Sequence, residues 1–124
     1  MRMKKLMTRQ FAKWASKQKI PENELITVLS DVQDGIFVAN LGGHIYKKRI
    51  RFEGQGKSGS GRTIICYKRN DRAIFIHGFS KNDKANLSSR ELHAFKAFSK
   101  ILLGLSQDSI AIAIENGDFI EVKL

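Results

Sequence analysis

Basic side chains gather in the middle of the chain in a pattern that suits phosphate chemistry. The segment HIYKKRIRF alternates so that Lys47, Arg49 and Arg51 fall on one side of a predicted strand. A glycine-rich connection follows, and the β-prone run after it opens with Arg62. Guanidinium groups stay protonated and present a rigid fork of donors to phosphate oxygens. When these strands pair, their cations can converge on one face of a sheet.

A nucleotide-binding P-loop is the first interpretation that the glycine-rich connection invites. Gly56, Lys57 and Ser58 match the end of the G-x-x-x-x-G-K-[ST] motif, whose backbone amides hold phosphate. The first glycine of the motif is missing, because Arg51 stands five residues before Gly56. A second glycine-serine run and a β-prone segment follow, where the motif needs the N-terminus of a helix. The sequence therefore favours a loop between strands, and Lys57 stays as a candidate cation.

Cleavage of RNA without a metal is a reaction that such cations can perform. A base removes the proton of the 2′-hydroxyl, cations stabilise the phosphorane, and an acid protonates the departing 5′-oxygen. We predict that Arg62 stabilises the charge on the phosphate. Lys57 is predicted to bind phosphate or to act as the general acid. His77 is the candidate for proton transfer, because an unperturbed imidazole titrates near neutrality, and Lys81 completes the predicted catalytic set.

The other basic residues of the central region are predicted to bind the RNA backbone. They are Lys47, Lys48, Arg49, Arg51 and Lys68. Lys48 falls on the apolar side of its strand, so we expect it to snorkel or to lie at a sheet edge. His77 shares the parity of Phe75 and Phe79 in its strand. A core or boundary histidine with one hydrogen bond therefore remains the alternative interpretation of this residue.

The length and the charge narrow the class of protein. A chain of 124 residues fits a single domain, here residues 1–124, which can bury a core without disulfides or metals. The formal net charge is +10, which is typical of a small domain that meets a polyanion or an acidic protein. Much of it lies in residues 1–20 and 44–69. A solvated charged face is the ordinary alternative, above all for the first of these blocks.

Several kinds of site are not predicted. Cys66 is alone, and His44, His77 and His93 lack the spacing of metal ligands, so we expect neither a metal nor another cofactor. We find no serine or cysteine triad and no suitable pair of carboxylates. No segment has the length and apolarity of a signal peptide or a membrane span. We therefore expect a soluble cytoplasmic protein with no membrane partner.

The hydrophobic periodicity predicts an α+β fold. The predicted strands are residues 3–7, 44–52, 62–68, 73–80 and 119–122, and the predicted helices are residues 9–17, 21–35, 88–104 and 106–115. Ser88 and Glu91 have capping-box spacing at the start of the third helix. The apolar stripe of the second helix is expected to include Ile36. The segment 106–115 also alternates with a period of two, so a strand is the alternative there.

The order of these motifs resembles the RelE/HigB-like toxins of bacterial type II toxin-antitoxin systems, in the RelE/ParE superfamily. The segments that carry the resemblance are LGGHIYKKRIR, GQGKSGSGRTIICYKRNDRAIFIHGFSKND and the S-x-x-E-L helix. The resemblance covers roughly residues 8–122, and the HigB-like branch is the closest match. It implies a RelE-like fold, in which a small, twisted, mainly antiparallel sheet packs against N-terminal helices and a C-terminal helical segment follows.

The resemblance also implies a function. Such toxins cleave messenger RNA without a metal, commonly during translation on the ribosome. A cognate antitoxin is implied, in this branch a helix-turn-helix protein, and an acidic contact surface on it would complement the charge of +10. ParE-like relatives with the same fold act on gyrase, and a non-catalytic RNA-binding module is a further alternative.

Residue roles follow from the resemblance position by position. Arg62 matches the arginine that opens the central strand of the family, and Lys47 and Arg49 match the basic strand before it. Lys81 matches the basic position after the last strand, and position 77 is one at which this branch tends to place an aromatic or histidine ring. Gly61 stands where the family often has an aromatic residue. Base stacking from that position is therefore not expected here.

Overall fold

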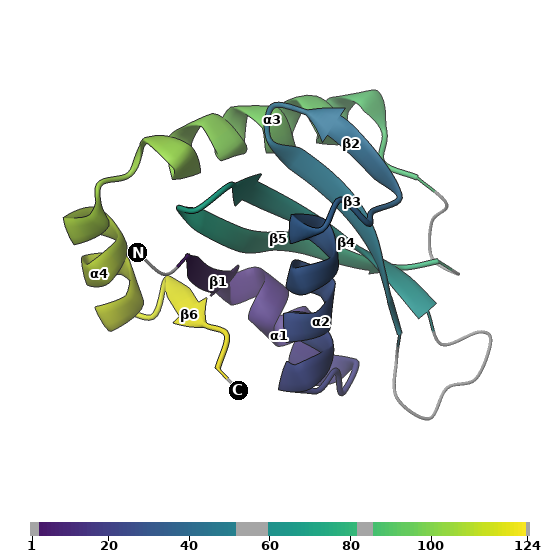
Figure 1. Cartoon of the computed structure of the whole chain (residues 1–124), viewed down its shortest axis with the longest axis horizontal. Helices are drawn as coiled ribbons and strands as arrows, with labels where there is room; N and C mark the ends of the chain where they lie inside the picture. The colour runs from purple at the N-terminus through teal and green to yellow at the C-terminus, as the bar shows by residue number, and fades with distance from the viewer. Residues whose placement is uncertain (1–2, 52–59, 82–85, 124) are drawn as a thin grey trace.

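The computed structural model describes residues 3–51, 60–81 and 86–123. They form strands β1 (Lys4–Thr8), β2 (Ala39–Gly42), β3 (Ile45–Arg51), β4 (Ser60–Lys68), β5 (Arg72–Ser80) and β6 (Phe119–Glu121). The helices are α1 (Arg9–Lys17), α2 (Glu22–Gln33), α3 (Ser89–Gly104) and α4 (Gln107–Glu115) (Figure 1). The predicted α+β class is confirmed, and each predicted element is present; strand β2 was not predicted.

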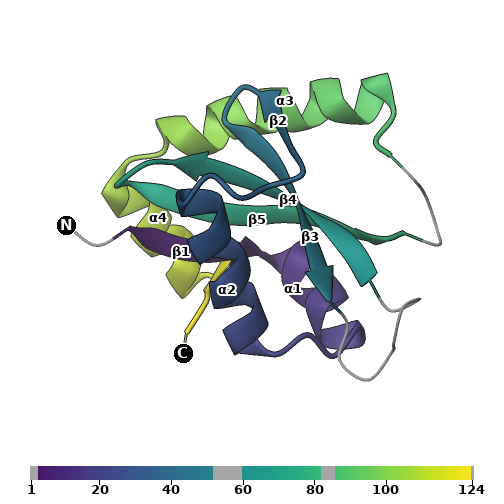
Figure 2. The ribbon, with the colours of Figure 1, turned by 45° about the vertical axis from the view of Figure 1, so that its right-hand side comes forward.

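All six strands join one sheet, in the order β2-β3-β4-β5-β1-β6. The strands from β2 to β5 pair antiparallel with their neighbours along the chain. Strand β1 pairs parallel with β5 on one side and antiparallel with β6 on the other. The first and last strands of the chain are therefore neighbours in space, as Figure 2 also shows.

Helices cover both faces of the sheet (Figures 1 and 2). Helices α1 and α2 pack on one face, where Phe11 stacks on Phe75 with ring centroids 4.6 Å apart. Helices α3 and α4 supply Leu102 and Ile110 to a second core on the other face. Two separate apolar layers therefore hold the strands from both sides, which fixes the direction in which each strand side chain points.

The helix ends follow the sequence signals closely. The predicted capping box is confirmed: the Glu91 backbone N–H donates to Ser88 Oγ at 3.1 Å, and the Ser88 N–H donates to Glu91 Oε1 at 2.9 Å. Helix α4 begins after Ser106, whose side chain accepts a hydrogen bond from the Ser109 N–H. The helix predicted for this segment is therefore confirmed, and the strand alternative is wrong. The prediction for Ile36 is wrong. Helix α2 ends at Gln33, and the side chain of Ile36 is 55% exposed beyond it.

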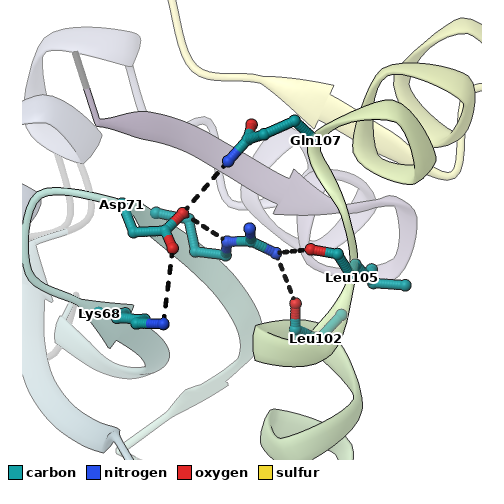
Figure 3. A network of polar contacts seen from close by, with 6 residues as sticks. Lys68, Asp71, Leu102, Leu105 and Gln107 are labelled. Atoms are coloured by element: carbon teal, nitrogen blue, oxygen red, sulfur yellow. Dashed lines mark hydrogen bonds and ion pairs between the residues drawn. The ribbon is translucent and has the colours of Figure 1, made fainter. Parts of the chain in front are cut away.

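A buried arginine, Arg72, joins the β4–β5 turn to the junction of α3 and α4. Figure 3 shows its partners Asp71, Leu102 and Leu105. Arg72 Nη1 donates to the carbonyl oxygens of Leu102 and Leu105, each at 2.8 Å, and Arg72 Nε donates to Asp71 Oδ1 at 2.8 Å. The carbonyls at the C-terminus of a helix lack partners within the helix. Arg72 satisfies two of these carbonyls and so fixes the position at which the chain turns into α4.

Among the described residues, no single helix is long and apolar enough to cross a membrane. Helices α3 and α4 reach that length and composition only as a pair bent by 107°.

Candidate nucleic-acid interface

Three neighbouring strands align the candidate cations across the sheet. Arg49 of β3 lies opposite Arg62 of β4, which lies opposite Phe79 of β5. In the adjacent row, Lys47 lies opposite Ile64, which lies opposite His77. Directly opposed residues point to the same face of a sheet. These rows therefore put the cations on the face that also carries α3, and we define the basic face as Lys47, Arg49, Arg51 and Arg62.

The pair of Arg49 and Arg62 is the electrostatic centre of the basic face. Like charges directly opposite each other destabilise a sheet. The pKa of Arg62 is lowered, first by the partial burial of its guanidinium and second by the positive charge of Arg49. Among the described residues neither guanidinium forms an ion pair, and Arg62 Nη1 donates only to the carbonyl of Gly61, at 3.2 Å. An anion between the two arginines would relieve their repulsion.

His77 reaches the basic face because of a β-bulge. The pairing of β4 with β5 shifts between Ile64 and Ile65, so that residues 76 and 77 occupy the space of one residue. The spacing of two residues between Phe75 and His77 predicts that they share one face of the sheet, and this prediction is wrong. Phe75 belongs to the core under α1, whereas Phe79 belongs to the core under α3. A bulge changes the alternation of side chains along a strand, and the sequence shows no local sign of it.

The ring of His77 lies at an apolar border of the basic face. Its centroid is 5.1 Å from that of Phe95 in α3 and 5.9 Å from that of Phe79. The residue is only partly buried. The contact with Phe95 was not predicted from the sequence, because helical periodicity gives no signal for it.

The structure does not bring Lys48 to the other candidates. Lys48 points to the face that carries α2, where its Nζ lies 3.2 Å from Asp31 Oδ2. This ion pair, rather than snorkelling, accounts for a lysine on the apolar side of β3. Lys48 lines a groove of 380 Å³ beside α2, which Arg49 and Arg51 also line where β3 extends past β2.

The three remaining candidates lie in different places. Lys68 is six residues beyond Arg62 along β4, about 20 Å away, and its Nζ is 3.7 Å from Asp71 Oδ2. Lys81 is exposed directly after β5, and its backbone N–H donates to the carbonyl of Ser60 at 3.3 Å. Lys81 therefore lies at the same end of the sheet as Arg62. Lys57 falls outside the described residues.

Metal binding and a reactive thiol are two further kinds of site that the described side chains were predicted to lack. The part of the chain that the structure describes holds no group of three His, Cys, Asp or Glu side chains that could bind a metal ion. Cys66 is buried against Ser99, with Sγ and Oγ 3.2 Å apart, and burial raises the pKa of its thiol. A thiol of this kind is a poor nucleophile at neutral pH.

A cavity of 590 Å³ lies away from the basic face. It has a mostly apolar lining from α1, α3, α4 and β6. None of the candidate cations lines it. We therefore place the site by the alignment of charges, because single-stranded nucleic acid is bound on extended basic grooves and surfaces as well as in deep pockets.

These features define a small α+β protein whose sheet carries a basic face on its central strands. A family model described as the RelE toxin of the RelE / RelB toxin-antitoxin system matches residues 3–122. The chain belongs to this family, and the resemblance seen in its sequence is confirmed at that level. It is the toxin of a toxin-antitoxin system, and a cognate antitoxin is its partner. No curated protein matches the chain.

Proposed function

We propose that this toxin is a metal-independent endoribonuclease that cleaves messenger RNA during translation on the ribosome. The observation that carries the proposal is the opposed pair of Arg49 and Arg62, which have no acidic partner among the described residues. A fold that keeps two like charges in register retains an unfavourable contact, and an RNA phosphate would make that contact favourable.

The proposed mechanism assigns separate tasks to the arginines and the histidine. Arg62 and Arg49 hold the scissile phosphate and stabilise the added negative charge of the phosphorane. His77 transfers a proton, either from the 2′-hydroxyl or to the departing 5′-oxygen, since it is the imidazole at the edge of the same face. Lys81 directly follows β5, where it binds a neighbouring phosphate or assists as an acid. Lys57 falls outside the described residues, and the same role is proposed for it from the sequence alone. The proposed reaction needs no metal, because the arginine and lysine side chains supply the positive charge that stabilises the phosphorane.

The antitoxin partner completes the proposal. We place the protein in the HigB-like branch, in the cytoplasm, with an antitoxin of the helix-turn-helix type. An acidic surface on that antitoxin would match the net charge of +10 and would cover the basic face. Release of the antitoxin then exposes the arginine pair to RNA.

Arg62→Ala tests the proposed function. Wild-type toxin and the variant are induced briefly in cells, and new 5′ ends in messenger RNA are mapped by primer extension. Loss of a preorganised donor to the transition-state charge typically lowers the rate about 10²–10³-fold, so we expect new RNA ends only with wild type. Lys68→Ala is the matched control, because it also removes one positive charge from β4 but lies about 20 Å from Arg62. Loss of its predicted contact with the RNA backbone should leave new RNA ends detectable.

The alternative activity predicts a different result in the same cells. Intact messenger RNA, together with growth arrest and gyrase-dependent DNA breaks, would overturn the ribonuclease proposal in favour of a ParE-like activity. Circular dichroism of each purified variant verifies that the sheet is folded.

Arg62→Lys adds a geometric test, because an ammonium keeps the charge but loses the planar fork of the guanidinium. We expect this variant to keep part of the cleavage activity.

A further inference from the structure

We propose that Lys47 and Asn86 form a nucleobase pocket that selects guanine beside the cleavage site. The inference rests on the proposed function, because it takes RNA as the substrate of the basic face. It adds a residue, Asn86, that neither the sequence patterns nor the family match assigns to the site.

The pocket is a small cavity where β2, β3 and the start of α3 meet. It has a volume of 250 Å³ and is lined by Leu41, Lys47, Asn86, Leu87 and Leu92. The three leucines are partly buried and provide apolar walls. Pockets for drug-sized ligands usually measure about 300–1,000 Å³, so this cavity suits one flat ring better than a whole nucleotide. Apolar walls with two polar groups at one side are the usual composition of a small-ligand site.

The polar side of the pocket presents hydrogen-bond donors. Lys47 Nζ donates to Asn86 Oδ1 at 2.9 Å. An ammonium has no acceptor, so the amide must turn its oxygen to the lysine and its NH₂ away from it. Among the described residues this NH₂ has no acceptor. Lys47 keeps two further N–H donors. The two side chains together therefore offer adjacent donors to a ligand.

Guanine is the base whose edge matches two adjacent donors. It presents O6 and N7 as neighbouring acceptors, whereas adenine presents a donor, N6–H₂, next to N7. On the corresponding edge cytosine presents N4–H₂ and uracil presents O4. Cytosine also carries adjacent acceptors, N3 and O2, on its Watson–Crick edge, so cytidine 5′-monophosphate is a necessary comparison in the binding test. Single-stranded RNA exposes these edges when its bases are unstacked. The leucine walls hold any base by apolar contact, and the donors select among them.

The position of the pocket links it to the cleavage site. Lys47 precedes Arg49 by two residues on the same side of β3, a separation of about 7 Å. Leu92 precedes Phe95 by three residues in α3, so the pocket wall and the ring against His77 share one side of the helix. A nucleotide whose phosphate lies between Arg49 and Arg62 can therefore place a neighbouring base against Lys47 and Asn86.

Binding of mononucleotides tests the pocket without relying on catalysis. The affinities of purified toxin for guanosine 5′-monophosphate, adenosine 5′-monophosphate and cytidine 5′-monophosphate are measured by isothermal titration calorimetry. We expect guanosine monophosphate to bind about tenfold more tightly than the other two, which is the discrimination typical of a good two-point contact to a base edge. Asn86→Asp replaces the NH₂ donor with a carboxylate oxygen at nearly the same volume, so this preference should disappear.

Asn40→Asp is the matched control for Asn86→Asp. It makes the same chemical change in β2, where the Asn40 oxygen accepts a hydrogen bond from the Gly42 N–H, but it does not line the pocket. The control should keep the preference for guanosine monophosphate. Equal affinities for guanosine monophosphate and either other nucleotide in wild type, or an unchanged preference in Asn86→Asp, would overturn the pocket.

Sequencing of the cleaved messenger RNA separates this inference from the proposed function. With wild type we expect guanine to be enriched at one fixed position beside the cuts, and Asn86→Asp should reduce that enrichment while RNA is still cut. Cleavage with the same base profile in both proteins rejects the pocket but not the ribonuclease. Absence of cleavage in wild type rejects the ribonuclease, and the nucleotide affinities still decide on the pocket.

Discussion

Two arginines in this small sheet have opposite environments. Arg72 is buried and has a carboxylate and two carbonyl oxygens as partners. Arg62 is partly exposed and faces another arginine. The sequence alone gives both the same charge and nearly the same β-prone neighbours. The tertiary partners identify Arg72 as structural and Arg62 as available to a ligand. The number of basic residues in the sequence could not separate these two roles.

Asp71→Asn should destabilise the fold in a pH-dependent way. The hydrogen bond from Arg72 holds the pKa of Asp71 below its ordinary value. A lowered pKa in the folded state means that the carboxylate stabilises the fold above about pH 4, and that this contribution is lost as the pH falls through the folded pKa. At pH 7 we expect a loss of about 1–3 kcal/mol in unfolding free energy, measured by urea denaturation, and a smaller loss at pH 3.

Asp118→Asn is the control for this prediction. Asp118 lies 2.7 Å from Arg9, but both side chains are more than half exposed, and exposed pairs contribute little to stability. An equal loss in the two variants, or a loss at Asp71 that does not change with pH, would contradict the role given to Arg72.

At the scale of elements, the sequence predicted the helices and central strands well because their signals are local. Capping at Ser88 and the apolar periods of α1 and α3 depend only on nearby residues. Two features that shape the site are not local. The bulge in β5 that turns His77 to the basic face appears only when β4 is in register, and the ion pair of Lys48 with Asp31 appears only when α2 packs beside β3.

The contact between α1 and β5 gives a prediction at this scale. A Cβ added at Gly78 would lie 2.3 Å from a ring carbon of Trp14, which packs against the first core. We expect Gly78→Ala to lower the unfolding free energy by about 1–3 kcal/mol, because the rigid ring must move out of a packed layer. Thermal unfolding followed by circular dichroism measures the change.

Gly104→Ala is the matched substitution for Gly78→Ala. A Cβ at Gly104 meets no atom within 4 Å, and the residue is helical. Alanine is favoured over glycine in a helix by up to about 1 kcal/mol, so this variant should be as stable as wild type or slightly more stable. Similar melting temperatures for wild type and Gly78→Ala would show that α1 does not pack closely on β5.

At the scale of the whole molecule, the net charge of +10 predicts a polyanion or an acidic protein as the ligand but not where that ligand binds. Arg9, Lys48 and Lys68 belong to ion pairs, whereas Arg49 and Arg62 do not within the described residues. The composition therefore indicated the class of ligand. The pairing of strands was needed to find the face, and the family match was needed to connect it to a toxin.

The salt dependence of RNA binding distinguishes a defined face from diffuse attraction. Each phosphate contact on single-stranded RNA contributes about −0.7 to the slope of log K against log salt concentration. Arg49→Ala should therefore make the slope less steep by about 0.7, measured by fluorescence anisotropy with a short oligonucleotide. Arg9→Ala removes the same charge from an existing ion pair and should leave the slope unchanged. Equal effects would indicate that net charge alone attracts the RNA.

The place of β1 in the sheet has a consequence for how the sheet assembles during synthesis. Strand β1 precedes the other described strands in the chain, yet it pairs with β5, and its outer side pairs with β6, which lies more than a hundred residues later. Long-range pairings of this kind form late in folding. The hairpins that carry the arginines can associate earlier, but one edge of β1 stays open until residues 119–121 are synthesised. The complete sheet therefore forms only after residues 119–121 have been added, and a shortened chain that lacks them would leave one edge of β1 unpaired.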